Sequence, residues 1–278
     1  YRRGLMNKLI KSNILLVGCG KMGSALLSGW LDQKIGGPNI CVIEPQKSNL
    51  DTFLSHGVTL YNKLDDLELH YEPDLVLFAV KPQMMDEIIP AYKCFSGKSA
   101  FISIAAGKSI TYFETKLGKH NAIIRAMPNT PAAVRRGITV ACGNISVKKQ
   151  VQETCIALLT AVGEVRWLDD ENLIDAVTAI SGSGPAYVFL LTETMLLAGM
   201  EAGLDRKLAT ELAVKTVAGS GEVLQQSSEN ISILRENVTS PGGTTEAALS
   251  VLMGKNGMQK LISKAVNKAI KRSKALDG

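Results

Sequence analysis

A loop rich in hydroxyl groups, residues 238 to 245, has the composition of a small-anion site. It reads VTSPGGTT, and apolar residues follow at helical spacing, so we predict that a helix begins near Thr244 or Thr245. The first amides of a helix have no internal acceptor and lie at the positive end of its dipole, and preceding glycines let an anion come close. No lysine, arginine or histidine occurs in the loop or in the four residues after it. The pattern therefore favours a carboxylate over a triphosphate.

An ordinary helix cap is the alternative interpretation of this loop. Thr244 or Thr245 would then be the N-cap, and Gly242 and Gly243 would form a turn after Pro241. A cap needs one hydroxyl, whereas three hydroxyl residues fall within six positions here. This density favours a binding site.

A second glycine-rich loop lies near the start of the chain and reads GCGKMG. It follows an apolar run of strand length at residues 14 to 17, and a helical pattern follows it. In this context the spacing GxGxxG predicts dinucleotide binding, because the glycines allow a tight turn and bring a helix N-terminus to the pyrophosphate. The expected cofactor contacts in this loop are Gly18, Cys19, Gly20, Lys21, Met22 and Gly23.

Glu44 ends the next predicted strand, residues 40 to 43, and stands 21 residues after Gly23. An acidic residue there accepts hydrogen bonds from the adenosine ribose and repels a 2′-phosphate, which favours NAD over NADP. Lys47 nearby weakens this preference, and an ordinary surface glutamate is the alternative.

Alternating strands and helices position these loops. Further strand-like runs at residues 58–60, 75–80, 99–104, 122–124, 137–142 and 164–168 predict an α/β fold, a Rossmann-type doubly wound parallel sheet in residues 1 to 168. The strand exits at residues 80–82, 105–107 and 125–131 should line the cofactor cleft, since ligands bind beyond the carboxyl ends of such strands.

Residues 169 to 278 contain no convincing strand pattern and predict a second, all-α domain. Helical patterns occur at residues 173–180, 185–202, 205–226, 245–253 and 258–276. The helix from Pro185 is apolar on nearly every side, which in a small domain indicates burial against a partner subunit. We therefore expect an obligate oligomer formed through this domain, with the small residues 181 to 185 as the loop before the helix.

Composition excludes several functional classes. The 278 residues carry a net charge of +5, but residues 1–168 carry +7 and residues 169–278 carry −2, without basic–aromatic clusters. This distribution fits an anionic cofactor better than a nucleic acid. Five scattered cysteines and three isolated histidines indicate a reducing compartment, which we take as the cytoplasm, and argue against disulfides or a metal site. We expect no membrane span, and the residues before a candidate initiator, Met6, show no targeting pattern.

Six motifs together resemble the pyrroline-5-carboxylate reductase family. They are GCGKMG at 18–23, AVKP at 79–82, SIAAG at 103–107, IRAMPNTP at 124–131, SGSGPAY at 181–187 and, most specifically, VTSPGGTT at 238–245. The resemblance runs from about residue 14 to the last helix. It implies a Rossmann domain followed by an all-helical dimerisation domain, with homodimers that often assemble into decamers.

The resemblance also implies the chemistry, which is hydride transfer from NADPH or NADH to the C=N carbon of pyrroline-5-carboxylate, giving L-proline. The substrate carboxylate would contact Gly243, Thr244 and Thr245 with Ser240, and the Thr245 hydroxyl would meet the ring nitrogen as the catalytic group. Glu171 and Asn237 would lie near the substrate. The resemblance further implies cofactor contacts by Asn62, Val80, Lys81, Ala105 and Ala106. Family members differ at the position of Glu44, so membership leaves the choice between the two cofactors open.

Two other functional classes compete with this one. A β-hydroxyacid dehydrogenase shares the layout but needs a lysine inside the helix after the interdomain glycine loop, and no lysine occurs from residue 167 to 205. A non-catalytic NAD(P)-binding sensor would not need the hydroxyl-rich loop.

Overall fold

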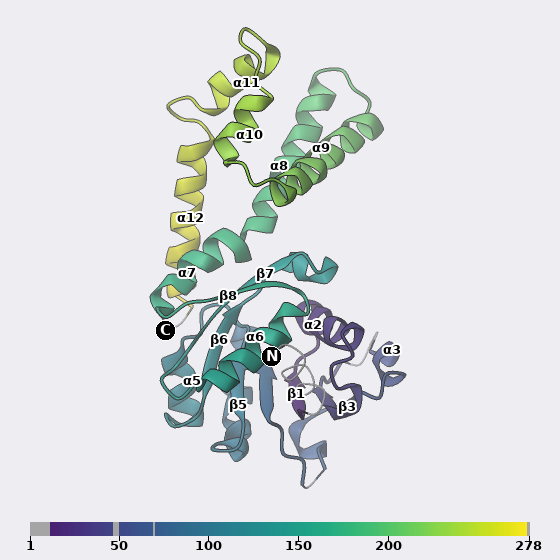
Figure 1. Cartoon of the computed structure of the whole chain (residues 1–278), viewed down its shortest axis with the longest axis vertical. Helices are drawn as coiled ribbons and strands as arrows, with labels where there is room; N and C mark the ends of the chain where they lie inside the picture. Colours follow the sequence, from purple (N-terminus) through teal and green to yellow (C-terminus); the bar gives the residue numbers. More distant parts are fainter. Residues whose placement is uncertain (1–11, 47–49, 69, 277–278) are drawn as a thin grey trace. The chain divides into compact units, whose positions relative to one another are not determined.

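A computed structural model describes residues 12–46, 50–68 and 70–276, and the chain divides into two compact units (Figure 1). The sheet unit contains the described residues up to Gly182 and those from Ile270 onward. The helical unit contains residues 183 to 269. Met6 and Lys47 lie outside the described residues.

The sheet unit is built on one eight-stranded sheet with strand order β3-β2-β1-β4-β5-β6-β7-β8. The strands are β1 Ile14–Val17, β2 Ile40–Ile43, β3 Thr59–Tyr61, β4 Leu75–Phe78, β5 Ala100–Ser103, β6 Ile123–Met127, β7 Gly137–Gly143 and β8 Gly163–Trp167. β1 lies between β2 and β4, with Val17 in register with Ile43 and Phe78. The chain order reverses beside β1, so the carboxyl end of β1 is the topological switch point where such folds bind ligands.

The predicted parallel sheet is confirmed except at one pairing. β6 and β7 pair antiparallel, with Arg125 opposite Cys142, whereas β7 and β8 pair parallel. Only a short 3₁₀ segment, Thr130–Val134, joins β6 to β7, and a parallel connection needs a longer crossover. The helix α6, Lys149–Thr160, provides such a crossover between β7 and β8.

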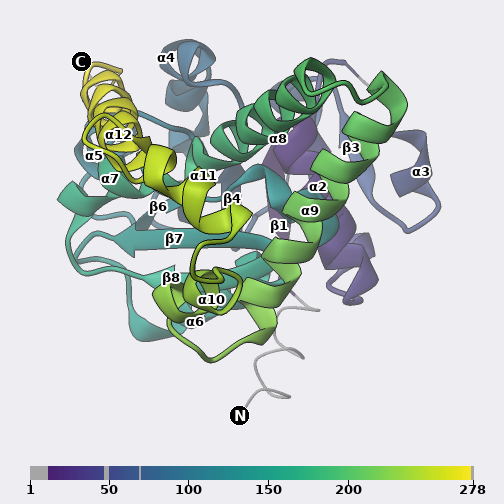
Figure 2. The same ribbon diagram turned by 90° about the horizontal axis from the view of Figure 1, so that it is seen from above.

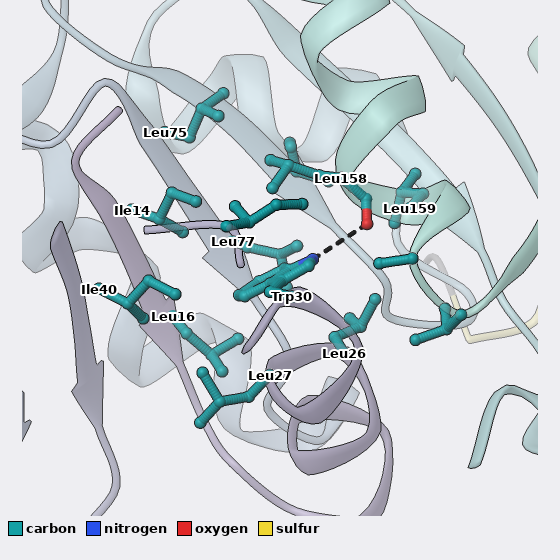
Figure 3. Packing of buried hydrophobic residues seen from close by; sticks show 14 of the residues in the cluster. Ile14, Leu16, Leu26, Leu27, Trp30, Ile40, Leu75, Leu77, Leu158 and Leu159 are labelled. Carbon is teal, nitrogen blue, oxygen red and sulfur yellow. Dashed lines mark hydrogen bonds between the residues drawn. The ribbon is translucent and has the colours of Figure 1, made fainter. Parts of the chain in front are cut away.

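Helices cover both faces of the sheet, and each face has its own apolar core. Ile14 and Leu16 point into one core and Leu15 and Val17 into the other, as expected for alternating side chains of a strand buried on both faces. In the first core the fully buried Trp30 donates a hydrogen bond from Nε1 to the Leu158 carbonyl at 3.0 Å (Figure 3). This bond joins α2, Lys21–Asp32, to α6, which lies 128 residues further along the chain. The second core is covered mainly by α4, Met85–Ile88, the 3₁₀ segment Ile89–Phe95 and α5, Ile110–Leu117.

The helical unit begins with a hairpin of two long helices, α8 and α9 (Figure 2). α8 spans Gly184–Glu201 and α9 spans Arg206–Gln226. Gly203 adopts a φ of +99° after α8, and the Asp205 side chain caps α9 by accepting hydrogen bonds from the Lys207 and Leu208 amides. The remaining helices are α10 Ile231–Asn237, α11 Thr244–Leu252 and the first part of α12, Met258–Lys274.

Two local predictions for this half of the chain differ from the structure. α10 is a helix that the sequence interpretation missed, although the Asn230 side chain caps it by accepting from the Ser232 amide. The predicted loop before α8 is largely helical instead, because a π-helical turn, Thr178–Gly182, continues α7, Ile174–Val177.

The apolar residues of α8 face solvent in the single chain. Phe189 is 67% exposed, and Val188, Leu190 and Leu191 are also exposed, while the buried hydrophobic residues found between 183 and 269 are Ala209 and Ala213. Glu171–Glu201, which joins α7 and α8, is one helical stretch among the described residues with the length and composition to cross a membrane. The expectation of no membrane span stays a prediction, because length and composition alone do not place a helix in a membrane.

Candidate active site

The glycine-rich loop lies at the carboxyl end of β1 and leads directly into α2. Gly18 has a φ of +88°, and a side chain there would lie 2.7 Å from Val80 Cγ1. At Gly23 a Cβ would lie 2.5 Å from the Gly18 carbonyl oxygen, whereas at Gly20 it would meet open space. Gly20 is the N-cap of α2 and no side chain caps the helix. The loop therefore fits a pyrophosphate, which needs close approach at Gly20 and open amides at the helix start.

Glu44 lies directly beside this loop. Its carboxylate accepts hydrogen bonds from the Cys19 amide at 2.8 Å and from the Gln46 amide at 3.0 Å. A hydrogen bond thus joins the loop directly to the acidic residue. Burial raises the pKa of the Cys19 thiol, the hydrogen bond with Ser24 opposes this shift, and Glu44 adds to it, so the thiol is less reactive than an exposed cysteine.

The other predicted cofactor residues follow neighbouring parallel strands at the same edge of the sheet. Val80 follows β4 and contacts the glycine loop, as the close approach at Gly18 shows. Asn62 follows β3, and the last carbonyl of that strand accepts a hydrogen bond from the Glu44 amide. Lys81 begins a 3₁₀ turn after Val80, while Ala105 and Ala106 follow β5. The sheet order thus brings these residues to one edge, although contacts to the glycine loop itself are found for Glu44 and Val80.

The hydroxyl-rich loop lies in the helical unit and ends at the start of α11. Gly243 is the N-cap, and no side chain caps the helix, so the alternative in which Thr244 or Thr245 is the cap was wrong. The Gly242 amide donates to Glu246 Oε2 at 2.7 Å, and the Gly243 amide donates to the Ser240 carbonyl at 2.9 Å. The Gly243 amide is therefore engaged within the turn, and the amides of Thr244 and Thr245 are the open ones.

The hydroxyl groups of this loop are also open. Those of Ser240, Thr244 and Thr245 make no hydrogen bond to any residue that the structure describes. In contrast, the Thr239 hydroxyl just before them donates to the Arg235 carbonyl at 2.7 Å, and the Ser250 hydroxyl after them donates to the Ala247 carbonyl. Open amides and open hydroxyls thus converge on the first turn of α11.

Asn237 and Glu171 already have protein partners. The Asn237 side chain donates to Glu229 Oε2 at 3.3 Å within the helical unit. Glu171 belongs to the sheet unit, where its Oε1 accepts from Arg125 Nη1 at 2.9 Å and from the Ile110 amide at 2.8 Å. The charge of Glu171 is balanced by the buried Arg125 side chain, which argues against direct binding of the substrate by Glu171.

Sequence interpretation missed Glu246, and it predicted Arg125 only as the start of the strand exit at residues 125–131, not as a buried charge. Glu246 fixes the turn at Gly242, where φ is +71°, and its position one turn into a glycine-led helix was the available signal. Arg125 is buried within β6, and its signal was a charge inside an otherwise apolar strand.

Comparison with known proteins identifies the family. The family model for pyrroline-5-carboxylate reductase dimerisation matches residues 171–276, and a model described as NADP oxidoreductase coenzyme F420-dependent matches residues 13–107. Pyrroline-5-carboxylate reductase of Pseudomonas aeruginosa is 37% identical over 267 residues, covering 95% of this chain and 96% of the relative. The chain belongs to the pyrroline-5-carboxylate reductase family.

Solved structures of pyrroline-5-carboxylate reductases share the whole fold. The protein from Coxiella burnetii superimposes with a TM-score of 0.87 at 35% identity, covering 96% of this chain and 99% of that one. The protein from Plasmodium falciparum, solved with NADP bound, gives 0.85 at 31% identity, covering 97% and 100%. The predicted boundary at residue 168/169 stays a prediction, because the dimerisation model begins at 171 and the compact helical unit at 183.

The contrast between Gly23 and Gly20 gives a test of the predicted cofactor loop. Gly23→Ala should lower the melting temperature and weaken NADPH binding more than about tenfold, because its methyl group would collide with the Gly18 carbonyl. Gly20→Ala should keep the melting temperature within a few degrees and weaken binding alone, since the space there is open. Thermal unfolding and NADPH fluorescence titration measure both. Equal losses of stability in the two variants would contradict this geometry.

Proposed function

We propose that the protein reduces pyrroline-5-carboxylate to L-proline with NADPH or NADH as reductant. The observation that carries this proposal is the open first turn of α11, where the Thr244 and Thr245 amides and three hydroxyls are without protein partners among the described residues. A second open helix start at Gly20 supports a dinucleotide site in the sheet unit. Family membership indicates the substrate, which would bind at the α11 loop and receive a hydride from a dinucleotide bound at the Gly20 loop.

The substrate has one carboxylate and one ring imine, and the α11 loop offers groups for both. The carboxylate would accept hydrogen bonds from the Thr244 and Thr245 amides and the Ser240 hydroxyl, where the helix dipole favours negative charge. Gly243 would contribute close approach rather than its amide, which already donates to Ser240. The Thr245 hydroxyl would face the ring nitrogen, and Asn237 would line the same region.

The reaction needs little acid–base chemistry from the protein. The bound nicotinamide supplies a hydride to the C=N carbon, and an imine that is protonated in solution already carries the proton that stays on nitrogen in proline. No lysine or histidine is required in the loop, and none occurs there. Orientation of the ring by the α11 loop and electrostatic stabilisation would account for the rate.

We infer a homodimer formed through the helical unit, with further assembly to a decamer, in the cytoplasm. The dimerisation model covers residues 171–276, and the exposed apolar side chains of α8 are the surface that a partner would bury. Burial of this surface against a partner subunit would account for the apolar composition of Glu171–Glu201. We expect no nucleic acid and no metal as partners.

Turnover tests the proposed function directly. Purified protein should oxidise NADPH or NADH when pyrroline-5-carboxylate is added, seen as a loss of absorbance near 340 nm. Dinucleotide binding without turnover of either cofactor would instead support the sensor alternative.

Thr245→Val should lower kcat on the order of 100-fold, since it keeps the side-chain shape and removes the hydroxyl proposed to face the ring nitrogen. The NADPH dissociation constant should change less than about twofold. Thr210→Val is the matched control, because its hydroxyl donates to the Arg206 carbonyl within α9. A loss confined to NADPH affinity in Thr245→Val would refute the placement of Thr245 at the imine.

Glu44→Ser should raise the ratio of kcat/KM for NADPH over NADH by about tenfold or more, since a 2′-phosphate would no longer meet a carboxylate. Glu44→Gln is the control for shape, because an amide oxygen can still accept from Cys19 while the charge is gone. Both variants should shift the ratio in the same direction. An unchanged ratio in both would mean that Glu44 does not face the ribose.

A further inference from the structure

Arg125 carries a full charge inside the sheet unit, with a side chain that is 5% exposed. Its Nη1 lies 2.9 Å from Glu171 Oε1, and its Nη2 lies 3.6 Å from Asp175 Oδ1. Its Nε has no hydrogen-bond partner among the described residues. Burial raises the pKa of the neighbouring Cys142 to about 12, with Glu171 adding to the shift, so the surroundings are poorly solvated. A charge in such a place is tolerated only with good partners.

Each carboxylate of this cluster has a second donor. Glu171 accepts from the Ile110 amide, the first amide of α5, at 2.8 Å. Asp175 accepts from the Ser273 hydroxyl at 2.7 Å, and Ser273 is itself buried. The cluster therefore joins β6, α5, the segment around α7 and the end of α12.

The segment around α7 and the end of α12 lie next to the two points where the chain passes between the sheet unit and the helical unit. Glu171 and Asp175 lie shortly before Gly182, where the chain leaves the sheet unit, and Ser273 lies shortly after Ile270, where it returns. The return segment also packs on Gly107, where a Cβ would lie 2.4 Å from Leu276 Cβ. Gly107 belongs to the turn after β5 that also contains Ala105 and Ala106, which are expected to line the cofactor.

We propose that Arg125, Glu171, Asp175 and Ser273 form a partly buried clamp that holds the exit and return segments on β6, and that all four act as positioning residues for the reaction. Glu171 would then act through Arg125 and α5 rather than by touching substrate. Holding both segments to one rigid strand limits the freedom of the chain on either side of the inserted helical unit, and small displacements are costly for hydride transfer. The kinetic part of this inference rests on the proposed function, whereas the clamp itself does not.

The clamp is tested with Ser273→Ala, which removes one hydroxyl at a helical position that tolerates alanine. Losing a hydrogen bond to a carboxylate should speed amide exchange about tenfold or more in residues 270–276 and also in residues 172–182 across the cluster. Exchange in β1 and β4 should stay unchanged. Ser263→Ala is the matched control on the same helix, since the Ser263 side chain is exposed. Faster exchange in residues 270–276 alone, or in neither segment, would overturn the clamp.

Measurements of kcat and of the NADPH dissociation constant distinguish a positioning role of the clamp from a purely structural role. Ser273→Ala should lower kcat several-fold with the NADPH dissociation constant unchanged within about twofold. Asp175→Asn, which keeps an acceptor oxygen for Ser273 and removes the charge facing Arg125, should act in the same direction. Faster exchange with unchanged kcat in both variants would overturn the positioning role. A wild-type protein without turnover would overturn the proposed function, and the exchange measurement would still decide whether the clamp exists.

Discussion

Both predicted binding loops lead into a helix whose first backbone amides have no side-chain acceptor. The rest of each site is arranged around these open amides. In α5, α9 and α10 a side chain caps the helix start: Ser109, Asp205 and Asn230 accept from the first-turn amides. α2 and α11 begin instead at Gly20 and Gly243 without a side-chain cap. α6 and α8 also lack a side-chain cap, but their N-cap residues are Lys148 and Ser183 rather than glycine. α2 and α11 both begin at exposed positions, so water or an anion can reach their open amides. A dinucleotide and an amino-acid carboxylate are two anions that fit.

Glycine and small residues make the first of these sites possible because two chain segments meet there without room for side chains. The Gly18 position touches Val80, and Gly23 touches Gly18 itself. β1 is fully buried between β2 and β4, so neither neighbour can move aside. The bond from Trp30 to Leu158 fixes α2 from its other side, which holds the helix start at the strand end.

Local sequence patterns predicted most of the strands and helices. The predictions failed where the structure depends on which strands or helices pack together. Eight strands and the long helices lie within a few residues of their predicted ranges, because strands buried on both faces read as continuous apolar runs. The reversed direction of β7 depends on a short connection, and α10 is too short for periodicity to identify. Hydrogen-bond partners could likewise not be predicted from the sequence: the Gly243 amide donates to the Ser240 carbonyl, and Glu171 pairs with Arg125. The roles expected of these two residues and of the remaining site residues stay predictions.

The packing of Leu276 against Gly107 has a consequence for biosynthesis. The sheet unit lacks its last contacts until residues 270–276 have been translated, so the helical unit is synthesised while the earlier unit is still unfinished. Chaperones would therefore meet a nascent chain with two incomplete parts rather than one finished part followed by another. Cutting the gene at the junction near residue 182 would yield a fragment with an exposed edge where that final turn belongs.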